Sequence, residues 1–236
     1  MVTDHKLKNN DETKSVFQTK YRSMVGRLQY LNHTRLDISN DVGVMARYQT
    51  SPKETHLATM KRILRYLKGI IDYGLWYDRN DSFELHAYTD VDWAGNIYDK
   101  KSTSGGAFFL GKKLVSWLSK KQDCIAQSTA ESEYVAATIN CTQIVWMKQM
   151  LTDIGITFNE PVVIHCDNTS TINMSKNMVM HSKTKHISIK YHFLRDKVEK
   201  KEIKLEYINT KEKIADIFTK PLLKDTFEYL RGMLGV

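Results

Sequence analysis

Hydrophobic residues in the first 70 positions recur every three or four residues, which is the spacing of amphipathic helices. Three such stripes are visible, at residues 21–31, 38–45 and 57–67. Just before the third stripe, the segment 51–54 (SPKE) places a capping serine, a proline at the first helical position and a glutamate three residues after the serine. The pattern predicts a helical segment over 21–70, preceded by a polar tail at 1–20, and its best-defined helix is at 53–68.

Beyond residue 70 the hydrophobic pattern changes to short runs that are typical of β-strands. Four such runs lie at residues 74–77, 83–89, 106–110 and 113–118. Helical and strand-like patterns then alternate, at residues 130–151, 161–166, 187–198, 203–207 and 214–234. This order, with strands first and then helices and strands in alternation, predicts an α/β fold with a mixed sheet.

The composition is that of a folded protein with an excess of basic residues. The 236 residues are 42% hydrophobic, and the formal net charge of +8 favours a polyanionic partner such as nucleic acid. The three cysteines are widely spaced and form no Cys-x-x-Cys pair, which argues against a disulfide framework and against a zinc site.

No apolar stretch reaches the length of a membrane span, and the first residues lack the apolar core of a signal peptide. We therefore expect a protein without a membrane partner that is not secreted. Its expected location is the cytoplasm, with a virus-like particle or the nucleus as further compartments.

Four acidic residues stand where predicted elements begin or end: Asp90, Glu133, Asp167 and Asp216. Each alone has an ordinary structural explanation, because a carboxylate in the first turn of a helix complements the helix dipole and an aspartate after a strand often forms a turn. As a set they can converge at one edge of a mixed sheet. Clustered carboxylates supply the hard oxygen ligands that a pair of magnesium ions requires. The set is therefore a candidate two-metal site.

The sequences around these residues resemble the four motifs of copia-type ribonuclease H. The matching segments are 88–95 (YTDVDWAG), 128–136 (STAESEYVA), 166–168 (CDN) and 215–220 (ADIFTK). Residues 21–77 are similar to the segment that connects reverse transcriptase to ribonuclease H in the Pol polyproteins of these retrotransposons. Together the motifs cover nearly the whole chain, in the expected order.

The resemblance implies an α/β domain over 71–225, with a ribonuclease H-like mixed five-stranded sheet flanked by helices, after an N-terminal helical segment and before a C-terminal tail at 226–236. It also implies an endonuclease that hydrolyses the RNA strand of RNA–DNA hybrids with two Mg²⁺ ions, for which Mn²⁺ is an alternative. Reverse transcriptase and other Pol segments would be its protein partners.

In that family the four carboxylates hold the ions. Carried over to this chain, Asp90 is the ligand that both ions share, and Glu133, Asp167 and Asp216 complete the site. Glu131 remains a rival of Glu133, although the sequence after Glu133 fits the family's motif better. Asp92 is interpreted as a supporting or turn-forming residue.

Six further residues are candidates for contacts with the hybrid. Asn168, Thr169 and Ser170 follow Asp167 directly, where their side chains can reach sugar or phosphate oxygens. Near the end of a predicted hairpin, backbone contacts are expected from Trp117, Lys120 and Lys121. A charge run at a hairpin end is equally well explained as a solvated turn.

One feature of cellular ribonucleases H is missing. Those enzymes place a histidine in the loop before the last aspartate, where it assists product release, whereas residues 209–213 (NTKEK) contain none. His181, His186 and His192 come earlier, in a segment typical of the copia type. We interpret them as structural or substrate-contacting residues, and the sequence leaves their role open.

Two other functions stay open from the sequence. The chain is alternatively a catalytically inactive remnant, domesticated or encoded by a pseudogene, that still folds. It is alternatively a nucleic-acid-binding module that uses the basic side of the helix at 53–68, although the same lysines and arginines also suit a solvated helix face. A secreted effector is disfavoured by the missing signal segment.

Overall fold

The computed structural model describes residues 7, 12–79, 82–176 and 188–236. The chain forms two compact units. Unit 1 consists of residues 1–76 and 220–236, and unit 2 consists of residues 77–219. Among the described residues, none of the helices is long and apolar enough to cross a membrane.

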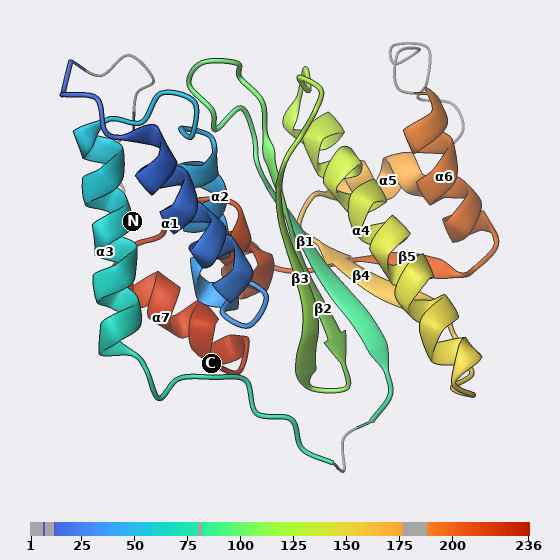
Figure 1. The fold of residues 1–236 in the computed structure, drawn as a ribbon. Coiled ribbons are helices and arrows are strands. Elements are labelled where there is room, and N and C mark those ends of the chain that lie inside the picture. Colours follow the sequence, from blue (N-terminus) through green and yellow to red (C-terminus); the bar gives the residue numbers. More distant parts are fainter. Residues whose placement is uncertain (1–6, 8–11, 80–81, 177–187) are drawn as a thin grey trace. The chain divides into compact units, whose positions relative to one another are not determined.

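Unit 1 is helical (Figure 1). Its elements are α1 (Gln18–Leu31), η1 (Leu36–Ile38), α2 (Ser39–Ala46), α3 (Glu54–Gly69) and α7 (Lys224–Met233). The first three predicted helical stripes are therefore present, and they face one another. The side chains buried between them are Tyr21, Val25, Leu28, Ile38, Val42, Met45, Met60 and Ile63.

Three local predictions for unit 1 differ from the structure. Ser51 does not cap α3, because Lys53 is the N-cap and its backbone N–H donates to His56 Nδ1 at 3.0 Å. The predicted polar tail at 1–20 is anchored near its C-terminal end, where Ser15 forms a β-bridge with Lys53. The expected tail at 226–236 lies largely within α7, because its residue Leu230 is buried.

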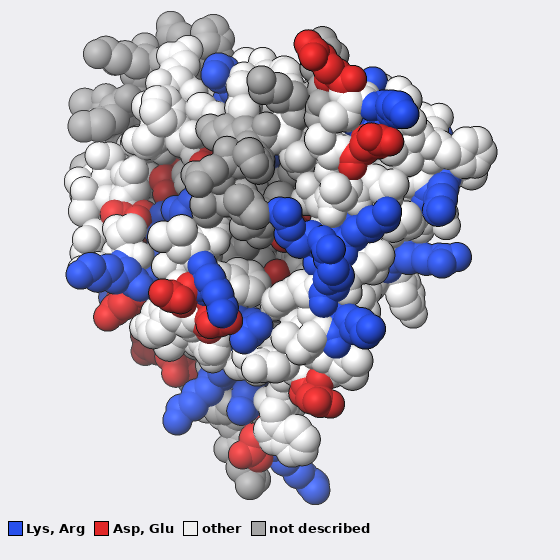
Figure 2. All heavy atoms as spheres, turned by 90° about the vertical axis from the view of Figure 1, so that its left-hand side faces the viewer, with Lys and Arg blue, Asp and Glu red and all other residues white. Residues whose placement is uncertain are grey.

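The outer side of α3 is basic. Lys61, Arg62, Arg65 and Lys68 are all exposed, while Met60 and Ile63 on the opposite side are buried. Figure 2 views the side of Figure 1 on which α3 lies, and it shows lysine and arginine side chains gathered there. Unit 1 thus presents a run of positive charge to solvent.

The described part of unit 2 contains a five-stranded sheet in the order β3-β2-β1-β4-β5. The strands are β1 (Leu85–Asp92), β2 (Thr103–Leu110), β3 (Lys113–Lys121), β4 (Val162–Cys166) and β5 (Ile203–Tyr207). The first three pair antiparallel, whereas β4 runs parallel to both β1 and β5. The predicted α/β class with a mixed five-stranded, ribonuclease H-like sheet is therefore confirmed.

Three helices form a layer on one face of the sheet: α4 (Thr129–Asp153), α5 (Thr169–Lys176) and α6 (Ser188–Glu199) (Figure 1). They bury the core of unit 2, which includes Ala87, Phe108, Ile144, Ile164, Leu194 and Leu205. The short helix η5 (Ile214–Phe218) packs against β1 and β2.

Two neighbouring glycines of β2 show that α4 and η5 lie on opposite faces of this strand. A Cβ atom added to Gly105 would lie 2.6 Å from Thr219 Cγ2 and 2.8 Å from the carbonyl oxygen of Ala215, on the η5 side. A Cβ atom on Gly106 would instead collide with the Asn140 side chain of α4. Successive residues of a strand point to opposite faces, so β2 is sandwiched closely between the two elements.

Three predictions for unit 2 and the C-terminus need correction. The run at 74–77 is not a strand, and Trp76 in it is 81% exposed. The predicted helical segment at 214–234 is divided into η5 and α7, because Pro221 removes a backbone donor and restricts the residue before it. Helix α5 was not predicted from the sequence.

Candidate active site

The four predicted carboxylates come from four different elements. Asp90 lies in β1, Glu133 in the first two turns of α4, Asp167 directly after β4 and Asp216 within η5. Because β1 and β4 are parallel neighbours, their carboxyl ends meet at the same edge of the sheet, and this places Asp90 and Asp167 side by side.

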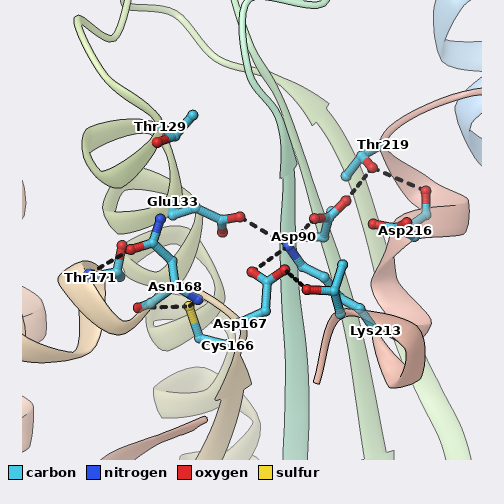
Figure 3. A network of polar contacts seen from close by, with 12 residues as sticks. Asp90, Thr129, Glu133, Cys166, Asp167, Asn168, Thr171, Lys213, Asp216 and Thr219 are labelled. Atoms are coloured by element: carbon cyan, nitrogen blue, oxygen red, sulfur yellow. Dashed lines mark hydrogen bonds and ion pairs between the residues drawn. The ribbon is translucent and has the colours of Figure 1, made fainter. Parts of the chain in front are cut away.

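Close packing at Gly105 brings the fourth carboxylate to this edge. Gly105 pairs with Asp90 across β1 and β2, and its missing side chain lets η5 approach the strand. The Thr219 hydroxyl donates to Asp90 Oδ2 and lies 3.0 Å from the carbonyl oxygen of Asp216. The residue after η5 therefore links Asp216 to Asp90 (Figure 3).

A lysine that the sequence analysis did not single out lies among the carboxylates. The Nζ atom of Lys213 is 3.0 Å from Glu133 Oε1 and 2.7 Å from Asp167 Oδ1, and it also forms an ion pair with Asp90 Oδ1. Figure 3 shows its ammonium group at the centre of these three side chains. The Lys213 side chain is 5% exposed, so these contacts are shielded from water.

The exposure of the site decreases from Asp167 towards Asp90. The side chain of Asp167 is 15% exposed and accepts a hydrogen bond of 3.1 Å from the Thr210 hydroxyl through Oδ2. Asp90 is 1% exposed, and Glu133 is 5% exposed. Asp167 and Asp216 are thus the half-buried members of the cluster, and Asp90 and Glu133 are its buried members.

The pKa values of Glu133 and Lys213 are both raised, for different reasons. Loss of hydration, assisted by the charges of Asp90 and Asp167, outweighs the attraction of Lys213 and raises the pKa of Glu133 to about 8. Burial alone would lower the pKa of Lys213, but the charges of Asp90 and Glu133 outweigh it, so the pKa of Lys213 is raised. Lys213 is thus held as a cation, while Glu133 gains a proton more readily than an exposed glutamate.

These residues fit divalent metal ions. Glu133 Oε2 is buried and accepts no hydrogen bond from the described part of the chain, which leaves one oxygen of this carboxylate without a donor. Ligand atoms of Glu133, Cys166 and Asp167 lie within 4.8 Å of one another. Burial raises the pKa of the Cys166 thiol to about 12, and a protonated thiol is a poor ligand for hard cations. The carboxylates are therefore the candidate ligands.

Glu131, the rival of Glu133, and Asp92, the expected supporting residue, have other contacts in the structure. Glu131 Oε2 accepts a hydrogen bond of 2.7 Å from the backbone N–H of Gln127, and the Glu131 N–H donates to the side chain of the N-cap Ser128. Glu131 thus takes part in the N-terminal capping of α4. Asp92 is the last residue of β1, and its carboxylate packs against Gly95 in the turn that follows, where an added Cβ atom would collide with it.

Asn168, Thr169 and Ser170 lie next to Asp167, at the start of α5. Asn168 Oδ1 accepts a hydrogen bond of 3.0 Å from the backbone N–H of Thr171 and so caps the helix. Thr169 and Ser170 are exposed, and Thr169 lines an open hollow with Asn173, Lys176, Lys204 and Tyr207. Two of the three predicted contact residues thus have side chains available to a ligand.

Trp117, Lys120 and Lys121 lie on the edge strand β3, which is separated from β1 by β2. Trp117 and Lys121 share one side of β3 and Lys120 lies on the other. Lys121 forms an ion pair with Asp99, which leaves Lys120 as the exposed cation of the group. The structure therefore does not present the three as one surface.

Among the three histidines, His192 is an exposed residue of α6. His181 and His186 lie outside the described residues.

Comparison with known proteins gives the family. No protein-family model matches the chain. The chain is 39% identical over 236 residues to the retrovirus-related Pol polyprotein from transposon RE1 of Arabidopsis thaliana, a match that covers 100% of this chain and 16% of the polyprotein. The chain belongs to the copia-type retrotransposon Pol polyprotein family. It is thus retrotransposon-derived and spans about a sixth of the length of these Pol relatives.

Two further relatives extend the comparison. The Pol polyprotein from transposon TNT 1-94 of Nicotiana tabacum is 38% identical over 227 residues, covering 96% of this chain and 17% of the polyprotein. The secreted RxLR effector protein 161 of Plasmopara viticola is 41% identical over 128 residues, which make up 54% of this chain and 90% of the effector. The Pol relatives match nearly the whole chain, whereas the effector matches about half of it.

Lys213, Thr219 and Thr210 are the site residues of this Pol segment that sequence reasoning missed. Thr219 is part of the motif at 215–220, so its position next to Asp216 was an available signal. Lys213 and Thr210 stand in a polar, charged loop (NTKEK) that resembles an ordinary solvated connection. Only the fold shows that the last residue of this loop is buried.

Proposed function

We propose that unit 2 is a ribonuclease H, an endonuclease that hydrolyses the RNA strand of RNA–DNA hybrids with two magnesium ions. The observation that carries this proposal is the meeting of Asp90, Glu133, Asp167 and Asp216 from four elements at one edge of the sheet. Like charges are costly to bury together, and such a cluster is explained when it holds cations. The Pol family membership supports the same activity.

Each carboxylate has a definable part in this proposal. Asp90 lies between Glu133 and Asp167 on one side and Asp216 on the other (Figure 3), which suits a ligand common to both ions. Glu133 offers its free oxygen Oε2, and the hydrogen bond from Thr219 fixes the orientation of Asp90. When bound, the two ions supply an activated water and stabilise the leaving oxygen, so the chain needs no nucleophile of its own.

The chain also offers groups for the sugar-phosphate backbone of a hybrid. Thr169 and Ser170 are exposed residues that directly follow Asp167 and Asn168, next to a half-buried carboxylate of the cluster. Hydroxyl groups of this kind commonly contact phosphate and sugar oxygens, and recognition of the 2′-hydroxyl distinguishes RNA from DNA. The net charge of +8 adds an attraction that is independent of sequence.

The test is cleavage of a labelled RNA–DNA hybrid by the full chain in the presence of Mg²⁺, with duplex DNA as the control substrate. The wild type is compared with Asp90→Asn and with Asp92→Asn, a matched change two residues along the same segment. We expect the wild type and Asp92→Asn to cut the RNA strand and Asp90→Asn to be inactive. A folded wild-type chain that binds the hybrid but never cuts it contradicts the proposal.

A second candidate is a nucleic-acid-binding remnant without catalysis. The exposed basic side of α3 favours it, since Lys61, Arg62, Arg65 and Lys68 form a run of charge that can follow a phosphate backbone (Figure 2). This function predicts hybrid binding that survives chelation of divalent ions and no strand cleavage.

A further inference from the structure

We propose that Lys213 is a built-in counter-ion that competes with divalent cations for the carboxylates and thereby sets the metal affinity of the site. This inference rests on the metal site of the proposed function. It assigns to Lys213 a role in determining at which concentration, and how tightly, metal ions bind to that site.

The positions of the interacting atoms carry the proposal. Lys213 Nζ contacts one oxygen each of Glu133, Asp167 and Asp90. An ammonium group has three N–H donors, so these three contacts use its whole donor capacity. Asp90 and Asp167 would each offer a metal ion an oxygen that Lys213 holds, whereas Glu133 keeps its second oxygen, Oε2, free. A cation therefore cannot take the held oxygens of Asp90 and Asp167 while the ammonium group keeps its place.

The backbone holds Lys213 where its side chain must face the carboxylates. Lys213 lies between η4 (Thr210–Glu212) and η5, and its N–H donates to the carbonyl oxygen of Thr210 at 3.3 Å. The next residues, Ile214 and Ala215, are buried against the sheet. Lys211, two residues earlier, is exposed instead. Lys213 thus occupies the site as a result of the fold, whereas Lys211 provides a matched lysine in the same loop that does not.

Removal of the ammonium charge has two consequences of opposite sign. Without metal, the buried carboxylates lose a counter-ion, so the folded state becomes less stable. With metal, no cation has to be displaced first, so binding becomes tighter. A purely structural lysine would give only the first effect, because a damaged site binds metal more weakly. Lower stability without metal together with tighter metal binding would therefore show that Lys213 competes with metal ions for the carboxylates.

The experiment measures Mg²⁺ binding to the full chain by titration calorimetry and Mn²⁺ binding by electron paramagnetic resonance, without nucleic acid. Wild type, Lys213→Gln and the matched control Lys211→Gln are compared. We expect Lys213→Gln to bind either ion on the order of tenfold more tightly than wild type, and Lys211→Gln to bind like wild type. Thermal unfolding with and without Mg²⁺ accompanies the titrations.

The unfolding temperatures keep the test decisive if Lys213→Gln is only marginally stable. That variant should unfold at a lower temperature than wild type without metal and should gain more degrees from Mg²⁺, because tighter binding stabilises the folded state more. Equal metal affinity of wild type and Lys213→Gln would overturn the role of Lys213 while leaving the metal site in place. Absence of binding by all three folded proteins would overturn the metal site, and the role of Lys213 with it.

Discussion

The hydroxyl group of Thr219 donates a hydrogen bond to Asp90 Oδ2 across 129 positions of sequence. Asp90 is 1% exposed, so water cannot replace this donor. The same hydroxyl lies within hydrogen-bond distance of the carbonyl oxygen of Asp216. Thr219 therefore orients Asp90 and also contacts the backbone of η5 at Asp216.

Replacement of Thr219 by valine should weaken both stability and activity. Valine keeps the shape but leaves a buried carboxylate oxygen without its donor, which costs about 1–3 kcal/mol. We expect cleavage of the hybrid to fall by about tenfold or more, because Asp90 loses its fixed orientation. Urea unfolding and the cleavage rate measure the two effects.

Thr210→Val is the control, since Thr210 also donates to a site carboxylate but is exposed. Equal losses of stability and activity in both variants would contradict the importance of the buried hydrogen bond from Thr219.

The two glutamates at the start of α4 should respond differently to the same change. Glu133→Gln removes a charge from the carboxylate cluster, and we expect cleavage to fall on the order of a hundredfold or more. Glu131→Gln keeps an oxygen that can accept from Gln127 N–H, so activity should stay within about twofold of wild type. Cleavage rates of the two variants at saturating Mg²⁺ show which of the two glutamates is needed for activity. The assignment of Glu133 fails if the Glu131 variant is the inactive one.

Gly105 should not tolerate a methyl group. Its Cβ atom would lie 2.8 Å from the carbonyl oxygen of Ala215, so η5 has to move away from β2. We expect Gly105→Ala to lose about 1–3 kcal/mol of unfolding free energy and to lose hybrid cleavage as well. Gly26→Ala in α1 is the contrasting variant: nothing lies within 4 Å of its added Cβ atom, and alanine should stabilise the helix by about 0.5–1 kcal/mol. A neutral Gly105→Ala would show that the contact with η5 is not tight.

The basic side of α3 should contribute to hybrid binding through salt-dependent contacts. We expect simultaneous replacement of Lys61, Arg62, Arg65 and Lys68 by glutamine to weaken binding and to reduce the slope of log K against log salt by about 0.9 for each lost phosphate contact. The control removes four exposed lysines elsewhere, namely Lys112, Lys200, Lys201 and Lys224. Fluorescence anisotropy with a labelled hybrid at several salt concentrations measures both slopes. Equal slopes in the two variants would mean that the basic residues of α3 act only through the net charge of the protein and make no phosphate contacts of their own.

The three cysteines should differ in their reaction with thiol reagents. Burial raises the pKa of Cys141 and that of Cys166 to about 12, so at pH 8 only about one molecule in 10⁴ carries the reactive thiolate at either position. Cys124 is half-buried and should be modified first. The measurement is colorimetric titration with a disulfide reagent, followed by mass mapping of the modified peptides. Rapid modification of Cys166 in the folded protein would show that the carboxylate site opens in solution.

Several elements could be predicted from the sequence. The predicted strand at 203–207 coincides with β5, and the helix expected at 130–151 is α4, at 129–153. The failures have local causes. The run at 74–77 has the composition of a strand but pairs with none of the described strands. Pro221 divides a helical pattern that periodicity alone continues to residue 234.

The candidate site could be predicted only in part. The carboxylates stand at the ends of recognisable elements, so their convergence follows once the strands are arranged in a sheet. The position of Lys213 could not be predicted in this way. Its contact with Glu133 joins residues 80 positions apart and depends on how closely η5 approaches β2. Burial of a lysine requires partners, and in this protein the partners come from three separate elements.

The division of the chain into two units means that unit 1 is assembled from both ends of the sequence. Its last helix, α7, returns after all of unit 2: Arg231 donates to the Tyr66 hydroxyl at 3.1 Å, across 165 positions, and its guanidinium lies 4.5 Å from the ring centre of Tyr73. During synthesis, residues 77–219 emerge before this helix exists, so the five-stranded sheet can form while the helical unit still lacks one of its parts. A fragment that ends at residue 219 would keep every carboxylate of the site yet leave Tyr66 and Tyr73 without their cation.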